Sequence, residues 1–317
     1  MLVTIQTIRT LVKKLLRGAM ISVACVLAGC HSILQPVELP PAPWPVRIRF
    51  LLTFDDGPSI RTGDNPTLSI LKQLELNDIQ PGIKAIFFVQ TRNTNGGGTE
   101  VGKAIMRRTY SAGHVLGLHS ASPRGHVSHA RMSSSDLNQS LQNGIADIRY
   151  LTGRNPILVR PPFLAFNPEI QDLYAANYMN MLLSDVSAND GVIHIFSASF
   201  RRRNHIHSEL RKVRAAIERN ELQRVGCCIP VVVTFHDVNT FTANHLSEYL
   251  HILMEAAVWT GLLPEDKPFY DTAVDIERAA VGRSILRPRK TQNAPATVTM
   301  RRSKPDLDQD VPTRVAQ

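Results

Sequence analysis

Two adjacent carboxylates, Asp55 and Asp56, follow an apolar run at residues 51–54 (Leu-Leu-Thr-Phe) and precede a Gly-Pro pair. An apolar run of this length that ends in turn residues is typical of a buried strand. Both carboxylates are therefore predicted at the carboxyl end of a strand, where ligands bind in α/β folds. Because adjacent like charges are costly, the pair predicts positive charge beside it, such as a metal ion together with an arginine. A plain turn is the alternative interpretation, since Asp, Gly and Pro are turn formers.

Further polar side chains follow apolar runs in the same way: His119 with nearby His126, Arg160, Asp185 and Asp190, and His236 with Asp237. Two histidines and a carboxylate can ligate a divalent metal ion and leave one position for water. A second carboxylate can act as general base, and a further histidine can protonate a leaving group. The set predicts metal-assisted hydrolysis of an amide or ester. Each residue alone also fits a turn, core or surface role, so the prediction depends on their shared position.

The segments that must position these side chains alternate between strand-like and helical patterns. Strands are predicted at residues 84–89, 115–118, 157–159, 179–183 and 229–235, and helices at 101–112, 135–151, 168–178, 208–218 and 243–259. Such alternation predicts a parallel sheet with helices outside it. One ligand site on one rim of a barrel explains why the polar residues follow strands.

The composition is that of a globular protein, with 43% hydrophobic and 20% charged residues among 317. The formal charge of +9 fits anionic surroundings, but no basic motif interleaved with aromatics is present, and no nucleic-acid partner is expected. The four cysteines include no CxxC pair, so no thiolate zinc site is expected. Cys227 and Cys228 precede an apolar strand and are predicted to be small core residues.

The N-terminal residues resemble a bacterial lipoprotein signal. A basic segment precedes an apolar run at residues 19–28, which is too short to span a bilayer as a helix. The run ends in Leu27-Ala28-Gly29-Cys30, which resembles the box whose cysteine becomes lipidated. This predicts anchoring of the mature protein to a membrane through acyl chains at Cys30. Since His31 follows the cysteine, the resemblance favours the outer membrane of the bacterial cell envelope, facing the periplasm. An ordinary signal peptide is the alternative.

Four segments are expected along the chain. They are a lipoprotein signal peptide at residues 1–29, a proline-rich tether at 30–46, a single catalytic domain at 47–280 and a basic disordered tail at 281–317.

From about Arg47 to Ala280 the chain resembles the polysaccharide deacetylases (the NodB homology domain, carbohydrate esterase family four). The motifs that carry the resemblance are Thr53-Phe54-Asp55-Asp56-Gly57-Pro58, Ala85-Ile86-Phe87-Phe88-Val89, Gly113 to Ser120, Arg160-Pro161-Pro162-Phe163, Asp185 to Asp190 and Phe235-His236-Asp237. The first matches the family motif in full and is highly specific. The resemblance implies an α/β fold, a distorted (β/α) barrel, and hydrolysis of N- or O-acetyl groups on a polysaccharide.

The resemblance also implies roles for individual residues. Asp55 is the base, Asp56 binds the metal ion with two histidines, His236 is the acid, Arg160 orients the base, and Asp190 tunes the acid histidine. Pro162, Phe163 and Thr234 fall at positions that face the substrate. Imidazole and carboxylate ligands suit zinc, with cobalt or nickel as alternatives.

The second motif departs from the family pattern, which spaces its two histidines four residues apart and so places both on one face of a helical turn. The residue four after His119 is Pro123. Counting back from Leu137 in the family register places His126 at the ligand position, after a Pro-Arg-Gly insertion. His129 is then expected to cap or pack.

Two further positions depart from the pattern. Gly191 stands where the family has a tryptophan, and Thr234 replaces a leucine that lines the acetyl pocket. The leading hypothesis is a metal-dependent deacetylase of an amino-sugar polymer, either a secreted glycan or peptidoglycan. The alternatives are a catalytically degenerate lipoprotein that binds glycan, and a hydrolase of a non-sugar amide on the same fold.

Overall fold

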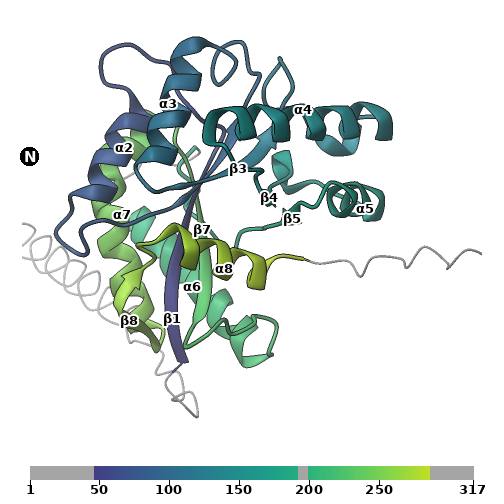
Figure 1. The fold of residues 1–317 in the computed structure, drawn as a ribbon. Coiled ribbons are helices and arrows are strands. Elements are labelled where there is room, and N and C mark those ends of the chain that lie inside the picture. Colours follow the sequence, from purple (N-terminus) through teal and green to yellow (C-terminus); the bar gives the residue numbers. More distant parts are fainter. Residues whose placement is uncertain (1–45, 192–198, 286–317) are drawn as a thin grey trace, which may run out of the picture.

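The computed structural model describes residues 46–191 and 199–285, which form a curved parallel sheet surrounded by helices (Figure 1). The expected signal peptide, the lipidation site Cys30, the tether up to residue 45 and the tail from residue 286 lie outside the described residues. Within residues 46–191 and 199–285, no helix combines the length and apolar content that a membrane crossing requires.

The strands are β1 (Val46–Asp55), β2 (Ile86–Gln90), β3 (Val115–Ser120), β4 (Leu158–Val159), β5 (Asn180–Met181), β6 (Val186–Ser187), β7 (Ile229–His236) and β8 (Leu262–Phe269). The helices are α2 (Pro66–Glu75), α3 (Glu100–Ser111), α4 (Ser134–Thr152), α5 (Pro168–Ala176), α6 (Ser199–Glu218), α7 (Thr240–Trp259) and α8 (Ala273–Arg283), with 3-10 turns at His129–Arg131 and Pro162–Leu164.

Strand β1 is central to the sheet, whose order is β5-β4-β3-β2-β1-β7-β6, with β8 also paired to β1. All of these pairs are parallel, as the alternating sequence pattern predicted. The register places Asp55 opposite His236 on β7 and opposite Phe88 on β2. The carboxyl ends of these strands therefore meet at one rim, which brings the predicted site residues within reach of one another.

The two faces of the sheet have different roles because side chains alternate along each strand. Phe50, Leu52 and Phe54 of β1 point outward into the main core beneath the helices. Leu51 points inward, where a second cluster lies against Ile276 of α8. In Figure 1, α8 crosses beside β1 and β7. The interior is apolar around α8, and Thr53 and Asp55 occupy its polar end near the rim.

Several elements differ from the sequence-based expectation. Helix α7 does not close the domain, since β8 and α8 follow it, and α6 begins at Ser199 rather than at Ser208. Helix α2 was not predicted, although Asn65 caps it and Pro66 occupies its first turn. Helix α8 runs to Arg283 and so includes the first residues of the expected tail.

Candidate functional site

Asp55 and Asp56 both face the rim although consecutive strand residues normally point to opposite faces. Asp55 follows the inward alternation of β1, with Thr53 two residues before it. Asp56 has a φ of 74°, a left-handed conformation that Asp adopts more readily than most residues. The chain therefore turns at Asp56 and presents its carboxylate beside that of Asp55 rather than to the outer core.

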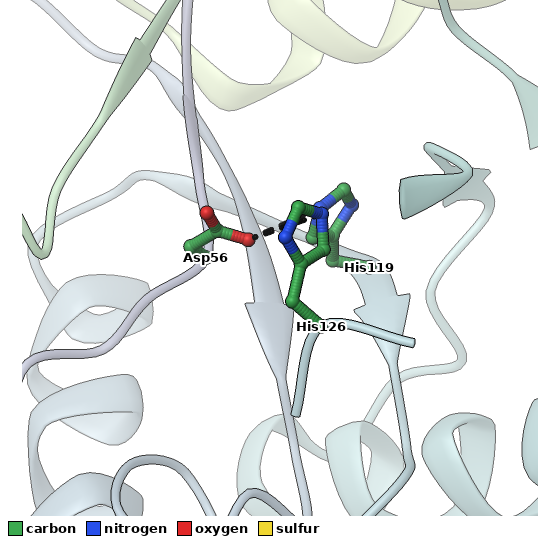
Figure 2. A group of neighbouring side chains, drawn as sticks. All are labelled: Asp56, His119 and His126. Atoms are coloured by element: carbon green, nitrogen blue, oxygen red, sulfur yellow. Dashed lines mark ion pairs between the residues drawn. The ribbon is translucent and has the colours of Figure 1, made fainter. Parts of the chain in front are cut away.

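The Asp56 carboxylate meets two imidazoles that come from β3 and the loop after it (Figure 2). Its Oδ1 lies 3.3 Å from Nε2 of His119 and 3.6 Å from Nε2 of His126. One ligand atom from each of the three residues lies within 4.8 Å of the other two. Carboxylate and imidazole ligands of this number suit a divalent ion with one position left open.

The hydrogen bonds and pKa values of these side chains are also those expected of ligands to a cation. Nδ1 of His119 donates to the Arg160 carbonyl oxygen at 2.8 Å, so Nε2 is the ring nitrogen that faces Asp56. Burial lowers the pKa of His126, which favours the neutral, ligating form. Burial alone would raise the pKa of Asp56, but the hydrogen bond and charges of the histidines outweigh it and lower the pKa to about 2. Nε2 of His126 is buried and has no hydrogen-bond partner among the described residues, so this nitrogen is available as a metal ligand.

The structure places His126, and not His129, beside Asp56. Nδ1 of His129 is 2.6 Å from the hydroxyl of Tyr174 on α5, and burial lowers the pKa of His129 to about 3. The Pro-Arg-Gly insertion forms a turn before His126. Gly125 has a φ of 75°, and a Cβ there would lie 2.6 Å from the Gln90 amide oxygen. Glycine at this position lets the loop pack against Gln90 while His126 reaches the rim.

Arg160 is fully buried and holds Asp55 in place. Its Nη1 donates to Asp55 Oδ1 at 2.9 Å, to Thr53 Oγ1 at 2.6 Å and to Thr234 Oγ1 at 3.0 Å. Its Nε donates to the Leu182 carbonyl oxygen at 3.0 Å. A buried charge with this many partners is strongly oriented. Asp55 therefore points to the site beside the metal-type cluster without being part of it.

His236 lies at the end of β7, across the rim from β2 and β3, and Asp190 binds it. Nδ1 of His236 donates to Asp190 Oδ1 at 2.7 Å, and its backbone N–H donates to Oδ2 at 2.8 Å. The Thr242 hydroxyl also donates to Oδ2. Burial lowers the pKa of His236, but the hydrogen bond to Asp190 and the charges of Asp190, Asp55 and Asp56 outweigh burial and raise it to about 9. At neutral pH this imidazole is protonated.

The three residues predicted to face the substrate lie in different environments. Phe163 is 64% exposed, has a φ of 61°, and stacks on His126 with ring centroids 4.1 Å apart. Pro162, in the same 3-10 turn, is buried. Thr234 is also buried, and its hydroxyl bonds Arg160 and Thr53. Thr234, which stands where the family has a leucine, therefore uses its hydroxyl to hold Arg160 in place.

Two of the strand-end carboxylates do not reach the site. Asp185 pairs with Arg283 of α8 at 2.7 Å and accepts from the backbone N–H of Val232. Asp237 accepts from the Thr67 hydroxyl at 2.7 Å and packs so closely on Gly57 that a Cβ there would lie 2.2 Å from its oxygens. Burial raises the pKa of Asp237 to about 7, against the effect of the Thr67 hydrogen bond. Asp185 and Asp237 therefore stabilise the segments that surround the site.

Sequence reasoning missed a residue that touches the cluster. The Gln90 side-chain amide donates to Asp56 Oδ1 at 2.8 Å and accepts from Asn93. Gln90 directly follows the predicted strand at 84–89, so the rule that polar residues at strand ends gather at the rim applies to it as well. Thr53 and Thr242 were also missed, because their contacts with Arg160 and Asp190 join segments far apart in the sequence.

Comparisons with known proteins agree with this description. Residues 47–182 match the family model described as polysaccharide deacetylase. Among solved structures, the chitin deacetylase of Colletotrichum lindemuthianum is 20% identical over 71% of this chain and 87% of its own, with a TM-score of 0.50. A mutant CE4 family pseudoenzyme with restored enzymatic activity is 19% identical over 69% of this chain and 68% of its own, also at 0.50. A family 4 acetyl xylan esterase from Clostridium thermocellum in complex with a cobalt ion is 23% identical over 72% of this chain and 89% of its own, with a TM-score of 0.47. No curated protein matches.

Residues 47–182 therefore belong to the polysaccharide deacetylase family, as the motifs predicted. The likeness to the first two solved structures confirms the predicted (β/α) barrel. The family is one of hydrolases, in agreement with the predicted enzyme class.

Proposed function

We propose that this chain is a metal-dependent deacetylase that removes acetyl groups from an amino-sugar polysaccharide. The observation that carries the proposal is the separation of two carboxylates at one rim. Asp56 meets His119 and His126, whereas Asp55 meets Arg160 and faces His236 across the strand register. This arrangement provides a cation site, a base and an acid in one place.

Asp56, His119 and His126 would hold a divalent ion, and zinc is the ion that their ligand types favour. When bound, such an ion polarises an acyl carbonyl and lowers the pKa of a water molecule. The side chains then divide the proton transfers. Asp55, held by Arg160, accepts a proton from the attacking water, and protonated His236 donates a proton to the leaving nitrogen or oxygen. Asp190 keeps His236 protonated and oriented.

A sugar polymer fits the surroundings of these residues. Exposed Phe163 presents an aromatic face directly beside His126, and Leu164 and Phe166 extend the exposed apolar surface away from it. Sugar rings have apolar faces that pack against such side chains. The likeness to a chitin deacetylase supports an N-acetylated amino sugar as the first substrate to test.

A catalytically degenerate glycan-binding protein is the second candidate, and it is motivated by the likeness to a CE4 family pseudoenzyme and by Gly191 in the fourth motif. It is less favoured here because the base, acid and ligand side chains that hydrolysis requires lie together.

The test is acetate release from chitin oligosaccharides and from N-acetylated peptidoglycan by the full chain, before and after treatment with a chelator. The proposal predicts acetate release that the chelator abolishes and added zinc or cobalt restores. Binding of the oligosaccharides without acetate release, in protein with one metal ion bound, would favour the degenerate candidate. Release only from a non-sugar acetamide would redirect the proposal to the third alternative.

A further inference from the structure

A second group of metal-binding side chains lies at the opposite end of the sheet. It consists of Cys227 and Cys228, which directly precede β7, and Glu265 on β8. Strand β7 has eight residues, so at about 3.3 Å per residue its two ends are roughly 23 Å apart. The group is therefore separate from the Asp56 cluster at the carboxyl rim.

Strand pairing brings these three residues together. Ile48 of β1 lies opposite both Ile229 of β7 and Pro264 of β8, so the residues next to these partners flank the same end of β1. A tight turn held by an antiparallel bridge between Val225 and Cys228 presents the two thiols. Cys227 is exposed, whereas Cys228 is buried. The expectation that both are core residues thus holds only for Cys228.

The ligand atoms are close enough to share one ion. One atom from each residue lies within 4.8 Å of the other two. Zinc ligands lie about 2.0–2.3 Å from the metal, so small side-chain movements would bring all three atoms to one ion. Oε1 of Glu265 is buried and has no hydrogen-bond partner among the described residues. Buried polar atoms normally have a partner, and a bound cation would be one for this oxygen.

The surrounding charges suit an anionic ligand set. Oε2 of Glu265 accepts from Arg47 at 3.0 Å, which leaves Oε1 for another partner. Arg224 donates to the Cys227 carbonyl oxygen at 2.7 Å, so a second guanidinium lies against the backbone of the residue that carries the exposed thiol. Two thiolates, one carboxylate and a divalent ion carry a net charge of −1, which a neighbouring arginine offsets. Carboxylates that ligate metal ions are commonly hydrogen-bonded to a neighbouring side chain, as Glu265 is to Arg47.

From this geometry we propose that Cys227, Cys228 and Glu265 form a binding site for one thiophilic divalent cation, with zinc as the physiological ion and cadmium as a probe. Thiolate ligands favour such ions over magnesium or calcium. On binding, each thiol loses its proton to solvent, and the ion gains two sulfur ligands and one oxygen ligand. The third ligand lies on β8, so the absence of a CxxC pair could not exclude this site.

The experiment uses the full chain in a Cys25→Ser, Cys30→Ser background, kept reduced with a phosphine and titrated with Cd²⁺. The readout is the ultraviolet charge-transfer absorption that arises only from thiolate–cadmium bonds, so an ion at the Asp56 cluster contributes nothing. We expect a saturable band at one equivalent. We expect its loss in Cys227→Ser, and affinity weaker by about tenfold or more in Glu265→Gln, the scale seen even for outer-shell partners.

Exposed Asp266, next to Glu265 on the same strand, provides the matched control: Asp266→Asn keeps the band and the wild-type affinity. Cys227 is exposed, so Cys227→Ser is expected to fold, and acetate release by that variant at the distant site gives an independent check. No band at one equivalent would overturn the proposal, as would a band that persists in Cys227→Ser. Wild-type affinity in Glu265→Gln would overturn the assignment of the third ligand.

Discussion

At the scale of single residues, the site depends on the different surroundings of two neighbouring carboxylates. Asp55 lies against a buried guanidinium, and Asp56 lies against two imidazoles. Asp56 owes its position to a left-handed turn that directs its side chain away from the outer core. The proposed base and the proposed metal ligand thus occupy adjacent positions because the backbone between them changes direction.

The assignment of the second histidine ligand can be tested by paired variants. His126→Ala is expected to lower metal content and acetate release together, because His126 Nε2 faces Asp56. His129→Ala is expected to keep metal content near the wild-type value, since His129 bonds Tyr174. Metal analysis of both purified proteins decides this. Loss of metal in His129→Ala with full content in His126→Ala would refute the assignment.

The proposed acid role of His236 predicts a pH dependence. Its pKa is raised to about 9, so the protonated form is present below that pH and is lost as the pH rises through it. A cation at Asp56 lowers this pKa, so the alkaline limb of turnover in the metal-loaded protein is expected below about 9. Asp190→Asn removes the main partner and is expected to shift the limb to lower pH by roughly one to three units. In a pH–rate series, Asp266→Asn serves as control; an unmoved limb in Asp190→Asn would contradict the role of this pair.

At the scale of elements, the strand ends were predictable and their partners across the sheet were not. The apolar runs before Asp55, His119 and His236 are local patterns, and each became a strand. The contacts of Thr234 with Arg160 depend on the register between β1 and β7 and on a side chain that reaches across from β4. Strand β8 carries prolines and charges without period-two alternation, so its conformation follows from pairing with β1 rather than from local preference.

Helix α8 is attached to the sheet by an ion pair that can be removed. Arg283 pairs with Asp185, and both side chains are largely buried. Arg283→Gln removes the salt-bridge partner of the buried Asp185 carboxylate and leaves it the hydrogen bond from the Val232 N–H, so we expect a loss of roughly 3 kcal/mol in the free energy of unfolding. Exposed Arg278 on the same helix is the control, with a change for Arg278→Gln within about 0.5 kcal/mol. Urea unfolding measures both; equal effects would show that the pair does not fasten α8.

At the scale of the whole molecule, the sequence predicted the parallel sheet, the outer helices and the rim on which the site lies. It did not predict that α8 fills the interior at the other end, because an eleven-residue helix with three buried apolar residues is a weak local signal. The choice of His126 rested on the family register, since the Pro-Arg-Gly insertion hides the usual spacing.

We further propose that the chain is lipid-anchored in the bacterial envelope through Cys30, on the strength of the Leu27-Ala28-Gly29-Cys30 box. Several acyl chains together hold a protein firmly to a membrane. Cys30→Ala is expected to abolish labelling by a fatty-acid probe in cells and to remove the protein from the membrane fraction. Labelling at the wild-type level in that variant would rule out the anchor.

The most direct test of the division of labour at the rim is a joint measurement of metal content and acetate release in Asp55→Asn and Asp56→Asn. We predict that Asp55→Asn keeps its metal ion but loses turnover by about 10²-fold or more, the scale of a missing general base. Asp56→Asn is predicted to lose the ion and turnover together. Loss of the ion in Asp55→Asn with full retention in Asp56→Asn would show that the two carboxylates have the opposite roles.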